Sequence, residues 1–76
     1  MRMSLLKSES IMKIEIERET DGRWIAEVPD LPGVMVYGQT KTDAVFKAEA
    51  LALRVIADRL DNGESIPELD ELFAVA

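Results

Sequence analysis

Two residue types are missing from this chain of 76 residues, which has no cysteine and no histidine. Without cysteine it can form no disulfide, no thiolate nucleophile and no cysteine-based zinc or iron–sulfur site. Without histidine it lacks the imidazole of a Ser–His pair and the commonest metal ligand. Carboxylates are the remaining acid–base or metal-binding groups. We therefore expect a protein that is not an enzyme, with no catalytic residues, no metal site and no cofactor.

Long apolar runs are also missing. No run reaches the ~18 residues of a membrane span, and residues 1–10 lack the apolar core of a signal peptide. We expect a cytoplasmic protein of one domain. A domain of this size buries a modest core and is marginally stable alone, so oligomerisation is the expected support.

The charge is acidic and uneven. The chain has 15 Asp and Glu against 9 Lys and Arg, a net charge of −6. Residues 12–38 hold three basic and six acidic residues, and residues 61–76 hold five acidic residues and no basic one. This charge repels nucleic-acid phosphates, so we expect no direct nucleic-acid binding. It suits a basic protein partner better.

Residues 1–11 show no sustained periodicity. We interpret them as an N-terminal extension, either flexible or loosely docked through Leu5 and Leu6. The patterned domain is expected in residues 12–76, so Met12 could itself be the natural start.

The patterned part begins with three predicted strands. Ile14 and Ile16 alternate with charged residues, as in a strand with one buried face. Thr20–Gly22 then predicts a hairpin turn, followed by a strand over Arg23–Val28. A short third strand is predicted over Val34–Tyr37. The short connections favour an antiparallel meander.

One long helix follows. Thr40 and Asp43 have the spacing of a capping box, and Gly63 is a typical stop signal, so we predict a helix over Lys41–Asn62. The apolar residues Leu72–Ala76 predict a short last strand. The expected fold is α+β in two layers: a three-stranded antiparallel meander, one long helix and a last strand, in the order β-β-β-α-β.

The helix is more apolar than one sheet can cover. At 100° per residue, one apolar stripe contains Ala44, Ala48, Leu51 and Val55. A second, nearly opposite stripe contains Phe46, Ala50, Leu53, Ala57 and Leu60. Three things could cover this second stripe: the tail 66–76 or Leu5 and Leu6 of the same chain, a second copy of the chain, or a different partner. The second stripe is our candidate oligomer interface.

The first strand offers one cluster of carboxylates. Glu15, Glu17 and Glu19 fall on one strand face, with Asp21 in the turn. Two-metal nucleases use carboxylates on a strand, but alternating glutamates are also the ordinary pattern of a solvent-facing strand. No convergent fourth carboxylate can be placed, and no catalytic site is predicted.

Several motifs resemble the HicB family of antitoxin-like proteins. They are Asp21-Gly22-Arg23-Trp24-Ile25-Ala26-Glu27-Val28, then Pro29-Asp30-Leu31-Pro32-Gly33, then Gly38-Gln39-Thr40-Lys41-Thr42-Asp43-Ala44. The resemblance covers residues 12–76. It implies a partial, catalytically degenerate ribonuclease H-like fold. It also implies that the domain forms dimers or larger oligomers and neutralises HicA, a small basic toxin that cleaves mRNA, by blocking its active site.

For this function we expect the partner-binding residues Glu15, Glu17, Glu19, Asp30 and the exposed side of Leu31. The alternative is a stand-alone homo-oligomeric domain without a toxin. Full antitoxins of this family carry a DNA-binding domain after the HicB-like domain, and 76 residues leave no room for one, so promoter binding is not expected of this chain alone.

Overall fold

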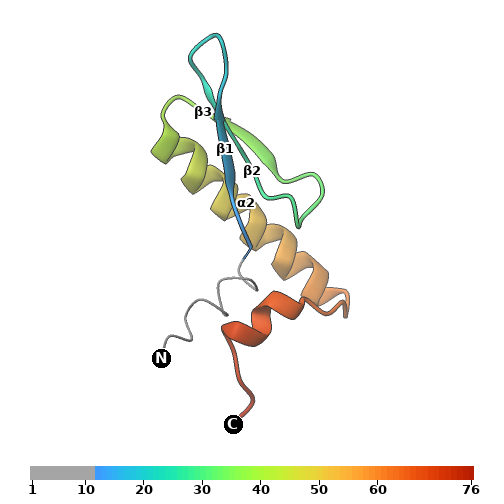
Figure 1. Ribbon diagram of the computed structural model, residues 1–76. Coiled ribbons are helices and arrows are strands. Elements are labelled where there is room, and N and C mark those ends of the chain that lie inside the picture. Colours follow the sequence, from blue (N-terminus) through green and yellow to red (C-terminus); the bar gives the residue numbers. More distant parts are fainter. Residues whose placement is uncertain (1–11) are drawn as a thin grey trace, which may run out of the picture.

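The computed structural model describes residues 12–76 and has two layers, a sheet and a helix (Figure 1). The strands form an antiparallel sheet in the order β1-β2-β3, and the helix packs against β2 and β3. The elements are β1 (Glu15–Arg18), β2 (Trp24–Glu27), β3 (Met35–Gly38), α2 (Lys41–Asp61) and the 3-10 helix η2 (Pro67–Glu71). The predicted α+β meander followed by one long helix is confirmed. None of the helices within residues 12–76 is long and apolar enough to cross a bilayer.

The first hairpin turns where the sequence predicts it. The Arg23 backbone N–H donates to the Asp21 carboxylate at 3.1 Å, and the Arg23 Nε donates to the same carboxylate at 2.9 Å. Gly22 adopts a φ of 92°, which favours glycine. The bond from the Arg23 amide, helped by its guanidinium, holds the pKa of Asp21 below its ordinary value. The turn sets the register of β1 against β2 and so decides which side chains share a face.

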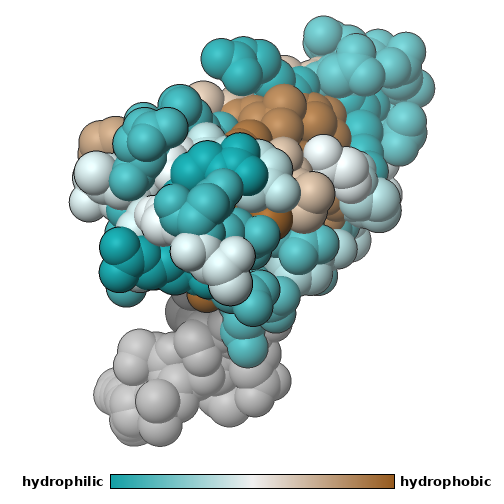
Figure 2. Space-filling view, turned by 90° about the horizontal axis from the view of Figure 1, so that it is seen from above, coloured by the Kyte–Doolittle hydropathy of each residue, from teal (hydrophilic) through white to brown (hydrophobic). Residues whose placement is uncertain are grey.

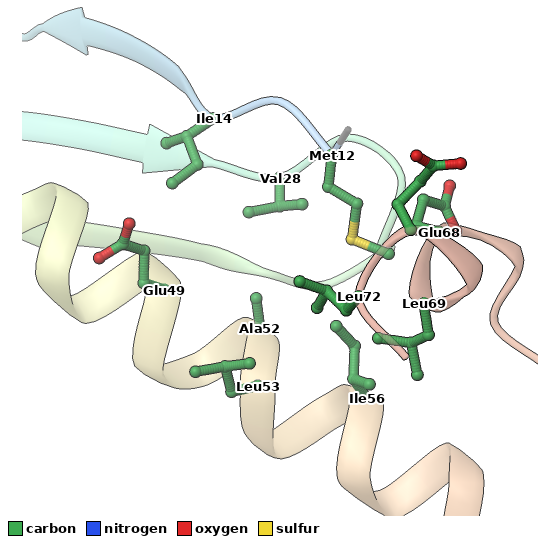
Figure 3. Close-up of a pocket in the computed structure, with 11 residues that line it drawn as sticks. Met12, Ile14, Val28, Glu49, Ala52, Leu53, Ile56, Glu68, Leu69 and Leu72 are labelled. Carbon is green, nitrogen blue, oxygen red and sulfur yellow. The ribbon is translucent and has the colours of Figure 1, made fainter. Parts of the chain in front are cut away.

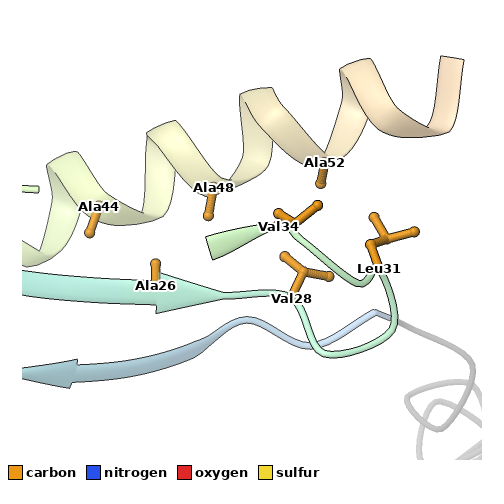
Figure 4. Packing of buried hydrophobic residues seen from close by; sticks show 7 residues of the cluster. All are labelled: Ala26, Val28, Leu31, Val34, Ala44, Ala48 and Ala52. Atoms are coloured by element: carbon orange, nitrogen blue, oxygen red, sulfur yellow. The ribbon is translucent and has the colours of Figure 1, made fainter. Parts of the chain in front are cut away.

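The loop between β2 and β3 turns inward. Leu31 N–H donates to the Val28 carbonyl, and Val34 N–H donates to the Leu31 carbonyl, both at 3.0 Å. This tight path brings Leu31 and Val34 into the core, where each is 1% exposed. The expectation that one side of Leu31 is exposed for a partner is therefore wrong. The leucine lies beyond the end of β2, in the buried cluster with Val34 and Ala52 (Figure 4).

The helix start confirms the predicted cap. Thr40 Oγ1 accepts a bond from the Asp43 N–H at 3.0 Å. The Asp43 carboxylate accepts a bond from the Gln39 N–H at 3.1 Å, one residue before the Thr40 N–H that a capping box would use, and also pairs with Lys47 at 3.2 Å. These contacts satisfy amides that the first helical turn leaves without intrahelical partners.

The core is thin because small residues meet across the two layers. Ala44, Ala48 and Ala52 lie on one face of α2 and are buried against the sheet. Figure 4 shows them facing the side chains of β2 and the inward loop. The buried cluster is Ala26, Val28, Leu31, Val34, Ala44, Ala48 and Ala52. Alanines let the helix approach the sheet closely, but they bury little apolar area each.

The predicted last strand is wrong. Residues 67–71 form η2, and residues 72–76 lie in no helix or strand. Pro67 starts the turn, where its missing N–H costs nothing. Figure 1 shows this segment beside the C-terminal half of α2, away from the free edges of the sheet, so it has no strand to pair with.

Candidate protein-interaction site

One face of the sheet is left uncovered by the described residues. The register places Ile16, Ala26 and Val36 side by side on the face that α2 covers. Because side chains alternate along strands, the neighbouring rows lie on the opposite face. We call this opposite face the outer face. Its side chains are Glu15, Glu17, Ile25, Glu27, Met35 and Tyr37.

Half of the outer face is acidic. Glu15 lies directly opposite Glu27, and Glu17 is the next outward residue on β1. All three side chains are exposed. Like charges directly opposite each other in a sheet are destabilising. In the described part of the chain no ion pair involves these three carboxylates, so their repulsion is not relieved within the domain.

The other half of the outer face is apolar and aromatic. Ile25 is half-buried, Met35 is 51% exposed and Tyr37 is 41% exposed. The Arg23 guanidinium lies 4.3 Å from the centroid of the Tyr37 ring, close enough for a cation–π contact. An apolar strip on the β3 side thus adjoins an acidic strip on the β1 side. Such a surface can bind a protein that presents both basic and apolar groups.

The remaining predicted contact residues are scattered. Glu19 is half-buried beyond the end of β1, where its backbone N–H donates to the Arg23 carbonyl at 2.8 Å. Asp30 is exposed in the loop after β2, outside the sheet. Sequence reasoning missed Ile25, Glu27, Met35 and Tyr37. The predicted turn at Gly22 indicated that β2 lies beside β1, but which residues stand opposite each other follows from the observed register.

The second stripe of α2 is also uncovered. Phe46 is 66% exposed, Leu53 63% and Leu60 47%. They follow one another at seven-residue intervals with Ala50 and Ala57 between them, the spacing of a coiled-coil seam. The tail 66–76 was one predicted cover of this stripe, but it leaves these side chains exposed. Leu5 and Leu6 lie outside the described residues.

A groove separates this stripe from the sheet. It has a volume of about 570 Å³ and runs between α2, η2 and the segment before β1. Figure 3 shows Met12, Ile14 and Val28 on the sheet side, pointing toward Ala52 and Ile56 of α2. Glu49, Glu68 and Glu71 add carboxylates to an otherwise apolar lining. Figure 2, a view of the molecule from above, shows an apolar patch bordered by hydrophilic groups on that face.

Within residues 12–76, no three acidic side chains come together in a way that could hold a metal ion. The pKa of Asp43 is lowered by the Gln39 amide bond and by Lys47, but this carboxylate is engaged in the helix cap. The outer face of the sheet thus combines acidic side chains on one half with apolar side chains on the other half.

Comparisons with models of known families, with curated proteins and with solved structures find no match to this chain. The likeness to HicB-type antitoxins therefore stays a prediction that depends on the quoted motifs. The surfaces have to be interpreted from their own chemistry.

Proposed function

We propose that this chain is a non-catalytic binding domain that captures a small basic protein on its outer face. The observation that carries the proposal is the row of carboxylates Glu15, Glu17 and Glu27, which form no ion pair with another residue of 12–76, beside an exposed apolar strip. Within the domain these carboxylates repel one another. A cationic partner would relieve that repulsion, so the surface suits a basic partner better than solvent alone.

The two halves of the outer face would do different work. The carboxylates attract a basic protein over a distance and raise its association rate, an effect that salt screens. Met35 and Tyr37 offer exposed apolar area for the centre of the contact. Tyrosine is among the residues that most often dominate binding energy at protein interfaces. Charge would bring the partner in, and apolar contact would slow its release.

The motif resemblance gives this partner a chemical identity. We propose a HicA-type toxin, a small basic protein that cleaves mRNA, and neutralisation by covering its active site. An acidic face is suited to this task because it competes for the same basic surface that an RNA-binding enzyme offers to phosphates. Neither a cofactor nor a metal is needed for such inhibition.

The test is co-expression with a HicA-type protein, followed by pull-down and measurement of association rates. In the test variant, Glu15→Lys and Glu17→Lys are combined. Its matched control combines Asp61→Lys and Glu64→Lys, which make the same charge change at exposed residues outside the sheet. We expect binding to fall more than tenfold in the test variant and much less in the control. Equal loss in both variants would show that only net charge matters and would contradict an outer-face site.

A second candidate function is a stand-alone homo-oligomeric domain without a toxin. The exposure of Phe46, Leu53 and Leu60 on one stripe of α2 favours it. Leu53→Glu should then dissociate the oligomer in sedimentation experiments. Ser65→Glu adds the same charge in an exposed loop and should not. If the wild-type chain stays monomeric at high concentration, this candidate is excluded.

A further inference from the structure

The two edges of the sheet differ in their charge. β1 forms one edge and carries Glu15, Glu17 and Arg18 among its four residues. β3 forms the other edge and reads Met-Val-Tyr-Gly, with no charged residue. Proteins commonly protect an open edge with charged side chains, because its free backbone groups can pair with another chain. Here β1 has that protection and β3 does not.

The register shows which backbone groups of β3 are free. Val28 N–H donates to the Val34 carbonyl at 3.0 Å, which places these two residues at a hydrogen-bonded position of the ladder, although only this one of the two possible bonds is formed. Hydrogen-bonded pairs recur at every second residue of an antiparallel ladder, which assigns Val36 to bonds with β2. Met35 and Tyr37 lie between such pairs. Their N–H and C=O groups therefore point away from β2, toward the open edge.

We propose that β3 of a second copy pairs with this edge in antiparallel orientation, about a twofold axis at Val36. Met35 of each copy then lies opposite Tyr37 of the other, and their outward backbone groups can form four hydrogen bonds. The result is one continuous sheet of six strands, with both copies of α2 on the same face. This inference does not depend on the proposed toxin partner.

Charge and side-chain character favour this partner and this edge. In the paired sheet, each Met35 side chain lies next to the Tyr37 ring of the other copy on the outer face, an apolar–aromatic contact of the kind that stabilises sheets. Pairing through β1 would instead bring Glu15 of one copy against Glu17 of the other. Two acidic residues lie on β1, one on the central strand β2 and none on β3, so the β3 edge is where two acidic chains can approach with least repulsion. Screening in ~0.15 M salt acts over about 8 Å and reduces what remains.

The paired dimer would also enlarge the outer face. The apolar strips of the two copies would join in the middle, with one acidic strip on each side. Because a four-residue strand buries far less than the ~800 Å² per partner of a standard interface, we expect a weak dimer whose population depends on concentration.

The test combines sedimentation velocity with amide hydrogen exchange over a concentration series of the full chain. We expect a monomer–dimer equilibrium in which the amides of Met35 and Tyr37 become protected as the dimer forms, by roughly tenfold or more. Met35→Lys should weaken the dimer about tenfold or more, since it replaces each apolar contact with Tyr37 of the other copy by a charged side chain. Ser65→Lys, which adds the same charge in an exposed loop, should leave it unchanged.

A second variant tests the backbone directly. Met35→Pro removes an N–H that points to water in the monomer, a position where an edge strand tolerates proline. It should abolish the dimer while circular dichroism shows the fold retained. Phe73→Asp, in the exposed tail, should have no effect on dimerisation.

Three results would overturn the proposal. The first is a monomer at every concentration. The second is an oligomer in which the Met35 and Tyr37 amides stay unprotected, which would assign the interface to another surface such as the second stripe of α2. The third is a dimer that Phe73→Asp dissolves, which would show that the tail of the second copy occupies the edge.

Discussion

Gly38 is where the last strand and the helix approach most closely, and its replacement gives a sharp test of the packing. A Cβ atom added at Gly38 would lie 2.4 Å from the backbone nitrogen of Ala44 and 2.7 Å from its Cα. Real Cβ contacts are not that short, so Gly38→Ala must push the first turn of α2 away from β3. Overpacking of this kind costs roughly 1–3 kcal/mol.

That cost is large for this domain. A chain of 76 residues is expected to have a free energy of unfolding of about 4–11 kcal/mol. For a domain of this size, each kcal/mol lowers the Tm by about 4–8 °C. Thermal and urea unfolding of Gly38→Ala against the wild type would measure the loss. Amide exchange in the first turn of α2 should also become faster.

Two further variants separate the clash from other effects of replacing a glycine. Gly63→Ala meets no atom within 4 Å, and its cost comes from a φ of 81° alone, about 1–2 kcal/mol. Adding Ala44→Gly to Gly38→Ala should not restore stability, because the nearest contacts are to backbone atoms that glycine also has. Rescue by that second change, or a Gly38→Ala variant as stable as the wild type, would refute the packing argument.

Three other predictions concern the core and the helix cap. Leu31→Ala should lower the free energy of unfolding by about 2–5 kcal/mol in urea titrations, because the side chain is fully buried; a loss below ~1 kcal/mol would mean that the loop is not held inward. Thr40→Ala should cost about 1 kcal/mol by removing the acceptor for the Asp43 amide, and Thr40→Ser should largely keep the stability. The Gln39 amide, and then Lys47, hold the pKa of Asp43 below its ordinary value of 3.8. The stability that the ionised carboxylate contributes is therefore present above pH 3.8 and is lost as the pH falls through the lowered pKa of the folded state. Asp43→Asn should therefore flatten the stability–pH curve on the acid side, and an NMR titration that finds an ordinary pKa for Asp43 would contradict the bond geometry.

The same features link stability to function. The core cluster consists of four alanines and three larger side chains, Val28, Leu31 and Val34. Apolar side chains that could have enlarged it, such as Phe46 and Leu53, instead face solvent. The domain thus leaves apolar surface available while keeping a small core. Binding to any of these surfaces would add stability to the folded state by mass action.

Local patterns predicted the elements well because each depends on neighbours in the chain. The period-two pattern around Ile14 and Ile16 placed β1, and the turn at Gly22 placed the hairpin. The cap at Thr40 and the stop at Gly63 bracketed α2 to within a residue. The same reasoning failed at Leu72–Ala76, because an apolar segment becomes a strand only when a sheet edge lies within reach.

Leu31 illustrates the same limit in the opposite direction. Its place in a loop between two prolines suggested an exposed contact, yet the loop turns this side chain into the core. No periodicity marks a single residue in a loop as buried. Its position is decided by the space that small side chains leave beneath the helix.

The sequence by itself determined the meander, the long helix and the excess of acid on the first strand, since alternation, caps and turn residues act over a few positions. Only the tertiary structure decided which acids stand together. Glu27 joins Glu15 because the hairpin register sets them opposite each other, and Met35 and Tyr37 complete the face from a third strand. Such a surface is a product of strand pairing, and pairing depends on residues far apart in the chain.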